Sequence, residues 1–207
     1  MFIPDLSLKG LRKRGFRLAG AVEMEYNKVV ATNIENFILK SLPKFSEATR
    51  KEKGVVLSKL IRGCKCCGLC YDTKFSPVPP KLTEDSLVLF IGRSPNKTEA
   101  MCNEMYPDGT PVGKLFRQYL SILDVAETES SVINMVYCYT KGNRPPESRH
   151  ISICSGFKKM ELEVIGDKLR VVFMMGNDAV RWVFGSKFPG VRQILGKVYK
   201  AEVARLS

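Results

Sequence analysis

The sequence predicts an α/β fold with a parallel central sheet, and three observations lead to that prediction. Short apolar runs of strand length alternate along the chain with segments of helical spacing. The runs are nearly continuous rather than alternating, which is typical of strands buried on both faces of a parallel sheet. The chain has 207 residues, 44% of them hydrophobic and 26% charged, which suits one sizeable core of ordinary globular composition.

Residues 1–55 are basic and irregular, and we expect them to form an N-terminal extension to a domain that covers residues 56–207. Within the extension, apolar residues at helical spacing predict a helix over 32–42. A second short helix is predicted over 55–62, with Gly63 as its C-cap.

From about residue 64 onward the strands and helices alternate. The predicted strands are 86–92, 131–138 and 169–176, and the predicted helices are 113–123, 151–166 and 177–185. Parallel strands end at one edge of the sheet, where α/β proteins bind their ligands. The loops that follow the strands are GRSPNKTE, CYTKGNRPP and MGND, and the first two carry lysine and arginine. We therefore expect a basic cleft at this edge that suits a backbone phosphate.

The charge of the chain favours a polyanionic partner. Net charge is +12, and residues 1–62 hold thirteen Lys and Arg against six Asp and Glu. Nucleic acid is the commonest polyanion, and the alternative is a basic surface that only aids solubility. The sequence has no apolar run of about eighteen residues and no signal-peptide pattern. We expect no membrane contact and a reducing, cytoplasmic location, where disulfides are rare.

Four of the chain's seven cysteines lie within GCKCCGLCYD. Cys64 and Cys67 form a C-x2-C pair, and Cys67 and Cys70 form an overlapping one. Two more, Cys138 and Cys154, lie far along the chain. One pair with two distant thiolates supplies four sulfur ligands, which suits tetrahedral zinc or a [4Fe–4S] cluster. The alternative is that Cys138 and Cys154 are small residues of the core.

Six motifs occur along the chain in this order: CKCCGL, LVLFIGRSPNKTE, DGTPVGKLFRQYL, VINMVYCYTKGNRPP, ISICSGF and VVFMMGNDAVRWVFG. In content and order they resemble those of the iron–sulfur uracil-DNA glycosylases, family 4 type. The resemblance implies a three-layer α/β/α fold with a central, mostly parallel four-stranded sheet. It also implies base excision repair chemistry, the hydrolysis of the N-glycosidic bond of uracil in DNA. We expect a monomer that binds single- or double-stranded DNA, with residues 1–55 available to replication or repair proteins.

The resemblance implies a structural [4Fe–4S] cluster, with zinc as the alternative, on four ligands: Cys64, Cys67, Cys138 and Cys154. Cys66 and Cys70 are alternative members of the first pair, and Cys102 is expected to be a bystander.

The resemblance also assigns site residues. Asn134 is expected to read the uracil edge, since a carboxamide offers both a donor and an acceptor. Tyr106 is the candidate for the aromatic ring that stacks on uracil, because the family's Phe is missing from this stretch. The remaining substrate-binding candidates are Gly92, Arg93, Ser94 and Pro95 of the loop on the water side, and Asn143 and Arg144 of the Gly-Asn-Arg-x-Pro loop.

Two departures from the family pattern bear on catalysis. Arg93 replaces the loop's usual Glu and stays protonated, so it can clamp an anion but cannot act as a general base. Glu99 is the candidate carboxylate in its place, and His150 is expected at the surface. No His-Pro-Ser segment precedes the end at Ser207. Three readings stay open: a fragment of a longer enzyme, a substitute for the family histidine, or a catalytically impaired DNA-binding or replication-associated module.

Overall fold

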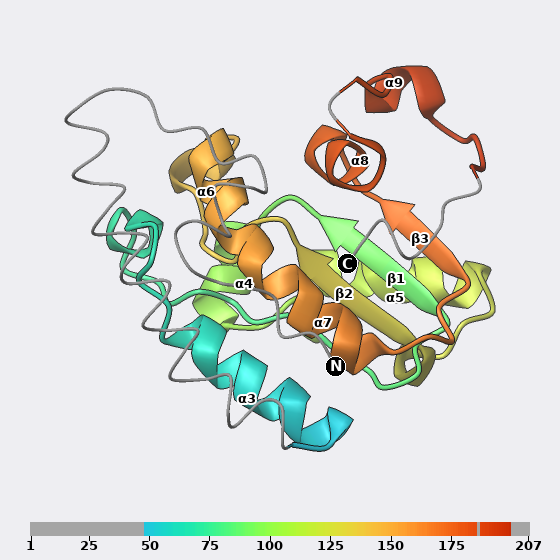
Figure 1. Cartoon of the computed structure of the whole chain (residues 1–207), viewed down its shortest axis with the longest axis horizontal. Helices are drawn as coiled ribbons and strands as arrows, with labels where there is room; N and C mark the ends of the chain where they lie inside the picture. The colour runs from blue at the N-terminus through green and yellow to red at the C-terminus, as the bar shows by residue number, and fades with distance from the viewer. Residues whose placement is uncertain (1–47, 186, 200–207) are drawn as a thin grey trace, which may run out of the picture. The chain divides into compact units, whose positions relative to one another are not determined.

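A computed structural model of the chain describes residues 48–185 and 187–199 (Figure 1). In this part, helices surround a parallel sheet, so the predicted α/β class is confirmed. The helix expected over 32–42 lies outside the described residues. The described residues belong to one compact unit. The predicted division at residue 55 stays a prediction, and helix α3 (Arg50–Arg62) runs through that position.

The sheet has the strand order β2-β1-β3, with β1 (Val88–Gly92) between β2 (Ser130–Asn134) and β3 (Val171–Met174). Both pairings are parallel, so the three strands end at the same edge of the sheet. Gly92 pairs with Asn134 at that edge. All residues of β1 are buried, as its nearly continuous apolar run predicts. The loops expected to share the carboxyl edge therefore all begin there.

The expected number of strands is wrong for the described residues, because the sheet has three strands instead of four. A proline-rich segment, residues 76–81, runs beside β2 and forms a single antiparallel bridge between Lys81 and Val132. The Val78 N–H also donates to the Tyr137 carbonyl at 2.8 Å. Proline lacks an N–H donor, so this segment cannot extend the bridge into a regular ladder.

The remaining helices are α4 (Lys97–Cys102), α5 (Pro111–Ile122), α6 (Ser148–Cys154), α7 (Lys158–Ile165), α8 (Asn177–Phe184) and α9 (Val191–Ile194). Short 3-10 turns are η1 (Leu69–Tyr71), η2 (Glu127–Glu129), η3 (Lys141–Asn143) and η4 (Ser155–Phe157). Among the described helices we find none with the length and apolar composition that crossing a membrane requires.

The predicted helices over 55–62, 113–123 and 177–185 are confirmed as α3, α5 and α8. The single helix predicted over 151–166 is wrong in one respect, because η4 divides it into α6 and α7. Helix α4 lies where a loop was predicted. It is too short for apolar periodicity to reveal it, and its only sequence signal is the capping box of Asn96 and Glu99.

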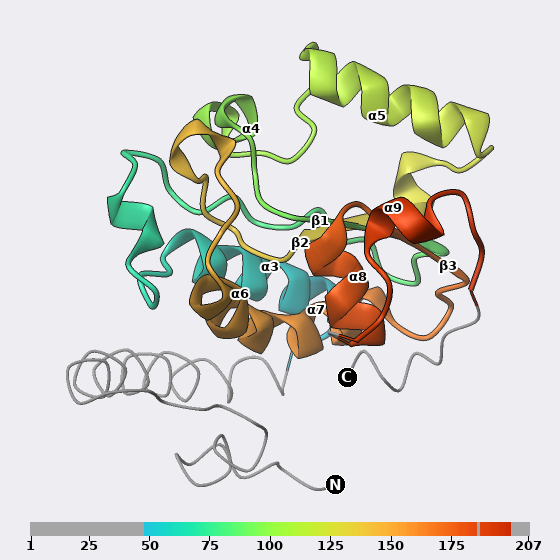
Figure 2. The same ribbon diagram turned by 90° about the horizontal axis from the view of Figure 1, so that it is seen from above.

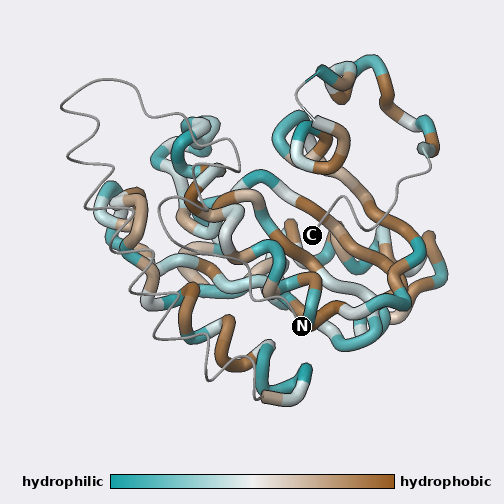
Figure 3. The backbone as a smooth tube through the Cα atoms, in the orientation of Figure 1, coloured by the Kyte–Doolittle hydropathy of each residue, from teal (hydrophilic) through white to brown (hydrophobic). Residues whose placement is uncertain are grey.

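The two faces of the sheet carry different cores. On one face, the aliphatic residues of β1 and β2 pack with those of α7 and α8: Leu89, Ile91, Ile133, Ile165, Ala179 and Val183. On the other face, the Phe90 ring stacks on Phe173 at 5.0 Å between centroids and meets Phe116 of α5 edge-on at 5.2 Å. Figure 2 shows α4 and α5 on one side of the sheet and α7 and α8 on the other, which confirms the three-layer arrangement. Hydrophobic residues concentrate along the strands between the layers (Figure 3).

Candidate active site

Asn134 and Gly92 lie side by side where β2 and β1 end. Asn134 is buried, with 6% of its surface exposed. Its side-chain oxygen Oδ1 lies so close to Gly92 that a β-carbon added at position 92 would collide with it. The methyl carbon of Met175, the first residue after β3, lies 3.7 Å from the same point. Only glycine at position 92 leaves room for the Asn134 carboxamide, so the fold brings these two expected site residues together.

Tyr106 reaches the same edge from the segment between α4 and α5. Its hydroxyl donates to the sulfur of Met175 at 3.8 Å, and its ring stacks on Phe116 with 4.3 Å between centroids. Burial raises the pKa of Tyr106 to about 12, and the nearby charge of Glu99 adds to the shift. The phenol is therefore neutral at physiological pH. Tyr106 contacts Met175, which in turn lies beside Gly92.

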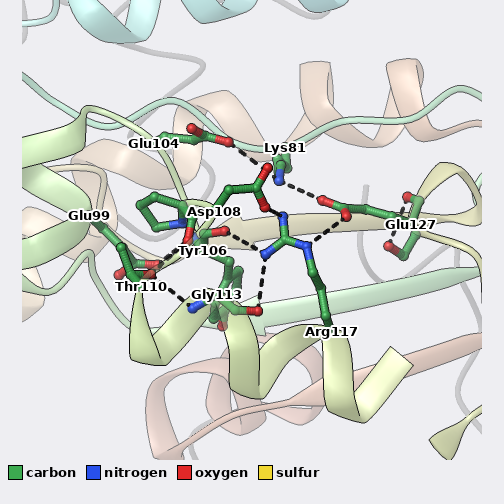
Figure 4. A network of polar contacts seen from close by, with 11 residues as sticks. Lys81, Glu99, Glu104, Tyr106, Asp108, Thr110, Gly113, Arg117 and Glu127 are labelled. Atoms are coloured by element: carbon green, nitrogen blue, oxygen red, sulfur yellow. Dashed lines mark hydrogen bonds and ion pairs between the residues drawn. The ribbon is translucent and has the colours of Figure 1, made fainter. Parts of the chain in front are cut away.

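Two side chains hold the backbone of Tyr106 (Figure 4). Its N–H donates to Oε1 of Glu99 at 3.1 Å, and its carbonyl accepts from Nη1 of Arg117 at 3.4 Å. The φ angle of Tyr106 is +50°, in the left-handed region that residues other than glycine seldom adopt. Anchors from α4 and α5 therefore stabilise a backbone conformation that is unfavourable by itself.

Glu99, the expected catalytic carboxylate, is engaged with the backbone through both of its oxygens. Besides accepting from Tyr106, it accepts the backbone N–H of Asn96 through Oε2 at 2.9 Å. The backbone N–H of Glu99 in turn donates to Oδ1 of Asn96 at 3.0 Å. Burial raises the pKa of Glu99, and these backbone hydrogen bonds oppose the rise. These contacts give Glu99 a structural task, and its catalytic role stays a prediction.

Arg117 is the centre of a wider polar network (Figure 4). It forms ion pairs with Asp108 and, at 3.4 Å, with Glu127. Glu127 pairs with Lys81 at 2.6 Å, and Lys81 also reaches Glu104 at 3.5 Å. The hydrogen bond from Lys81 lowers the pKa of Glu127. The network ties the segment between α4 and α5 to η2 and to the proline-rich segment.

One side chain joins the loops that follow β1 and β2. Nη2 of Arg93 donates to the Asn143 carbonyl at 2.8 Å. The Arg93 carbonyl in turn accepts the Val136 N–H at 2.9 Å. Ser94 is half-buried and Pro95 is buried, and both precede α4 in the same loop. The loop expected on the water side therefore begins at the carboxyl edge and is fixed to its neighbour.

Asn143 and Arg144 lie at the end of η3, and both are exposed. Gly142 and Asn143 have φ angles of +70° and +55°, which form the tight turn of this loop. Nε of Arg144 donates to the Lys141 carbonyl at 3.1 Å, and the Arg144 carbonyl accepts from Thr140. The fold thus brings Asn143 to Arg93 and leaves Arg144 on the surface.

The four thiols expected as metal ligands come from three parts of the chain. Cys64 and Cys67 follow α3, Cys138 follows β2, and Cys154 ends α6. All four are buried, and none forms a disulfide. The Cys67 thiol is hydrogen-bonded to those of Cys138 and Cys154, which lowers the pKa of Cys67 and raises the pKa values of its partners. Three of the four expected ligands are therefore in contact.

Cys64, the fourth expected ligand, is hydrogen-bonded to Cys66, which raises the pKa of Cys64 and lowers that of Cys66. Cys66 is also buried, whereas Cys70 is half-buried and Cys102 is exposed. The charges of Cys67 and Cys154 also act on the pKa of Cys66, so a fifth buried thiol lies at the same place.

The donor set fits a four-thiolate centre by chemistry and by burial, because buried sulfur ligands suit both zinc and iron–sulfur clusters. Three of the four thiols contact one another directly through the hydrogen bonds of Cys67 to Cys138 and Cys154. Within residues 48–185 and 187–199, no set of three or more His, Cys, Asp or Glu side chains has the spacing of a closed metal site. The fit therefore rests on the donors and their burial, not on a preformed coordination geometry.

His150 is buried, so its expected position at the surface is wrong. It is 5% exposed, and its Nδ1 accepts the backbone N–H of Glu147 at 3.2 Å, where α6 begins. The ring is close enough to Cys67 to affect the pKa of that thiol. The hydrogen bond to the Glu147 N–H explains how the polar ring of His150 can be buried.

A buried charged cluster beneath the end of β2 escaped the sequence analysis. Lys158 and Glu161 of α7 are 2% and 0% exposed, and they form an ion pair at 3.0 Å. Nζ of Lys158 also donates to the Asn134 carbonyl at 2.6 Å and to the Tyr137 hydroxyl. Burial lowers the pKa of Lys158 to about 7, an effect that the nearby charge of Cys154 opposes, and burial raises the pKa of Glu161 well above its ordinary value. The available sequence signal is helical spacing, because Lys158 lies three residues before Glu161 and seven residues before the buried Ile165.

Comparison with known protein families identifies the class to which this fold and site belong. The family model of the uracil DNA glycosylase superfamily matches residues 79–205, which is more than half of the chain. The matched region contains β1, β2 and β3 and the loops that follow them. The chain therefore belongs to the uracil DNA glycosylase superfamily.

Similar curated proteins narrow the class. A type-4 uracil-DNA glycosylase of Archaeoglobus fulgidus is 26% identical over 145 residues, which cover 69% of this chain and 70% of that protein. The type-4 enzyme of Sulfurisphaera tokodaii is 26% identical, with 66% of this chain and 61% of that protein covered. The type-4 enzyme of Saccharolobus solfataricus is 25% identical, with 67% of this chain and 64% of that protein covered. The predicted resemblance to the family 4 type is confirmed, and the low identity makes this chain a divergent member.

Proposed function

We propose that this protein is a uracil-DNA glycosylase that hydrolyses the N-glycosidic bond of uracil in DNA. The observation that carries the proposal is the meeting of Asn134, Gly92, Tyr106 and Met175 at the carboxyl edge of the sheet. An enzyme that acts on a flipped-out base needs a ring to stack on the base and polar groups to read its edge. Tyr106 and Asn134 are a ring and a carboxamide of the kinds required.

The reaction breaks the bond between C1′ of the deoxyribose and N1 of uracil. Water supplies the oxygen that C1′ gains and the proton that uracil takes up. Negative charge develops on the departing base, so donors aimed at the base lower the barrier. The amide nitrogen of Asn134 can donate to a uracil carbonyl while its oxygen accepts the ring N–H. Tyr106 remains neutral because its pKa is about 12, so its ring adds no charge that would repel the anion.

We assign the loop of Gly92, Arg93, Ser94 and Pro95 to the water side of the base. Arg93 stays protonated at physiological pH and therefore does not serve as the general base. One of its nitrogens is bound to the Asn143 carbonyl, and a guanidinium has further N–H donors for a DNA phosphate.

We further propose that Cys64, Cys67, Cys138 and Cys154 hold a [4Fe–4S] cluster, with zinc as the alternative metal. Support comes from the burial of all four thiols and from the contacts of Cys67 with Cys138 and Cys154. The group would supply a structural cross-link and no step of the hydrolysis. It would join the segments after α3, β2 and α6, of which the second begins next to Asn134.

The proposed partner is DNA, single- or double-stranded, in the cytoplasm or at the nucleoid. The net charge of +12 supports it, and affinity should fall with increasing salt concentration as bound counterions are exchanged. Contacts of residues 1–55 with replication or repair proteins, and a monomeric state, are part of the same proposal.

The test is cleavage of an oligonucleotide that contains a single uracil, with the same oligonucleotide carrying thymine as the control. Anaerobically purified protein is incubated with each, and alkali then breaks the strand at abasic sites. We expect breaks at uracil alone, and a rate roughly 100-fold lower for Asn134→Ala, the loss typical of a removed anion-stabilising donor. Binding of the same oligonucleotide without breaks would overturn the proposal in favour of a DNA-binding or replication-associated module on the same fold.

A further inference from the structure

We infer that Lys158 is a positioning residue that fixes the end of β2 and thereby holds the carboxamide of Asn134 in place. The inference rests on the proposed function of Asn134. Lys158 is buried, and its Nζ is bound to the backbone carbonyl of Asn134 at 2.6 Å. Its effect on a base at this edge would therefore pass through Asn134.

The surroundings of Nζ match an ammonium group. Its three acceptors are the Asn134 carbonyl at 2.6 Å, the Tyr137 hydroxyl, and the Glu161 carboxylate at 3.0 and 3.3 Å. An ammonium has three N–H donors, so each acceptor can receive one. Glu161 supplies its carboxylate from the next turn of α7 and pairs with Nζ inside the core. The side chain is thus held in one position by its own contacts.

Lys158 completes the hydrogen bonding where β2 ends. The N–H groups of Met135 and Val136 donate to the carbonyls of Gly92 and Arg93, each at 2.9 Å, and so continue the pairing with β1. The Asn134 carbonyl instead accepts from Lys158. A buried carbonyl without a partner costs free energy, so this contact fixes the peptide unit from which the Asn134 side chain projects.

Stability alone gives a weak reason for an ion pair at this place. A buried pair loses the hydration of both charges, and well-packed apolar residues often replace such a pair without loss of stability. An apolar side chain at position 158 could fill the same space, but it could not donate to the Asn134 carbonyl. The hydrogen bond to the Asn134 carbonyl is therefore a reason for a lysine at position 158 that stability alone does not give.

The test compares the double variant Lys158→Met/Glu161→Leu with the wild-type protein and with Tyr137→Phe. The double variant removes both charges together, so no unpaired charge is left buried. Tyr137→Phe is the matched control, because it removes another contact of Nζ and keeps the bond to Asn134. The first measurement is hydrogen–deuterium exchange of the peptide that covers residues 130–138, followed by mass spectrometry. The second is single-turnover uracil excision with varied DNA concentration.

We expect the amides at the end of β2 to exchange at least about 10-fold faster in the double variant, as expected when one buried hydrogen bond is lost. We expect the maximal single-turnover rate to fall by a similar factor, with the DNA concentration at half-maximal rate nearly unchanged because phosphate contacts remain. The Tyr137→Phe protein should match the wild type in both measurements. Equal exchange in the wild type and the double variant would overturn the inference. If the wild type excises no uracil, the proposed function fails, and the exchange result still decides whether Lys158 fixes the strand end.

Discussion

The backbone N–H of Tyr106 donates to the buried carboxylate of Glu99 at 3.1 Å, and this contact links two of the residues that were expected to take part in the site's chemistry. The carboxylate candidate holds the ring candidate in a left-handed backbone conformation. Glu99 therefore has a structural role that its place in the loop after β1 did not reveal.

Replacing Glu99 by Gln should lower stability, because an amide keeps one accepting oxygen and turns an NH2 group toward the second backbone N–H. We expect a loss of about 1–3 kcal/mol in the free energy of unfolding, measured by denaturant titration. Glu104→Gln is the matched control, since Glu104 is half exposed and lies 3.5 Å from Lys81, and its effect should stay within about 0.5 kcal/mol. Unchanged stability together with lost excision in Glu99→Gln would instead identify Glu99 as a catalytic carboxylate.

Gly92→Ala should displace the Asn134 carboxamide, because the added methyl group would collide with Oδ1. We expect uracil excision to fall roughly 10- to 100-fold, as for a misplaced catalytic group. Gly54→Ala in α3 is the control, since its added carbon meets only ordinary contact, 3.5 Å from Val164. That variant should excise normally and gain about 0.5–1 kcal/mol from helix propensity. Normal excision by Gly92→Ala would refute the assigned position of the carboxamide.

Cys138→Ala should release the metal group, because Cys138 is buried and in contact with Cys67. We expect purified wild-type protein to be brown and to contain iron and acid-labile sulfide, and the variant to lose both. Cys102→Ala should retain them, since Cys102 is exposed, unlike the four proposed ligands. A colourless wild-type protein that contains zinc would show that the bound metal is zinc and not an iron–sulfur cluster. Full retention of the metal in Cys138→Ala would contradict the ligand set.

The Lys81–Glu127 pair should make stability depend on pH in the acidic range. The hydrogen bond from Lys81 lowers the pKa of Glu127 in the folded protein. Its stabilising effect is therefore present above the unfolded pKa of roughly 4.3 and is lost as pH falls through the lower folded value. Glu127→Gln should reduce Tm at about pH 7 and leave it nearly unchanged at about pH 2. The exposed Glu84→Gln serves as the control, and a larger Tm difference at low pH would contradict the pairing.

Local patterns were sufficient for much of the fold and part of the site. Apolar runs predicted β1 and β2 because strands buried in a parallel sheet have few polar positions. Asn134 was predicted from the family resemblance and not from this pattern, because the apolar run continues to residue 138, whereas β2 ends at Asn134. Helix α4 escaped because six residues make too few turns to show a period. The proline-rich segment beside β2 was not foreseen because pairing there joins residues about fifty positions apart.

The sequence by itself determined the fold class and the family of the protein, because periodicity and motif order can be read along the chain. It also predicted the edge of the sheet for the site and the cysteines proposed as metal ligands. Only the tertiary structure decided that Glu99 holds Tyr106 and that Lys158 holds Asn134. A charged residue reads as solvent-exposed in a sequence, since burial of a charge is costly without a partner. Both charged residues here have backbone groups among their partners, and every residue carries such groups, so only folding reveals which of them a buried charge meets.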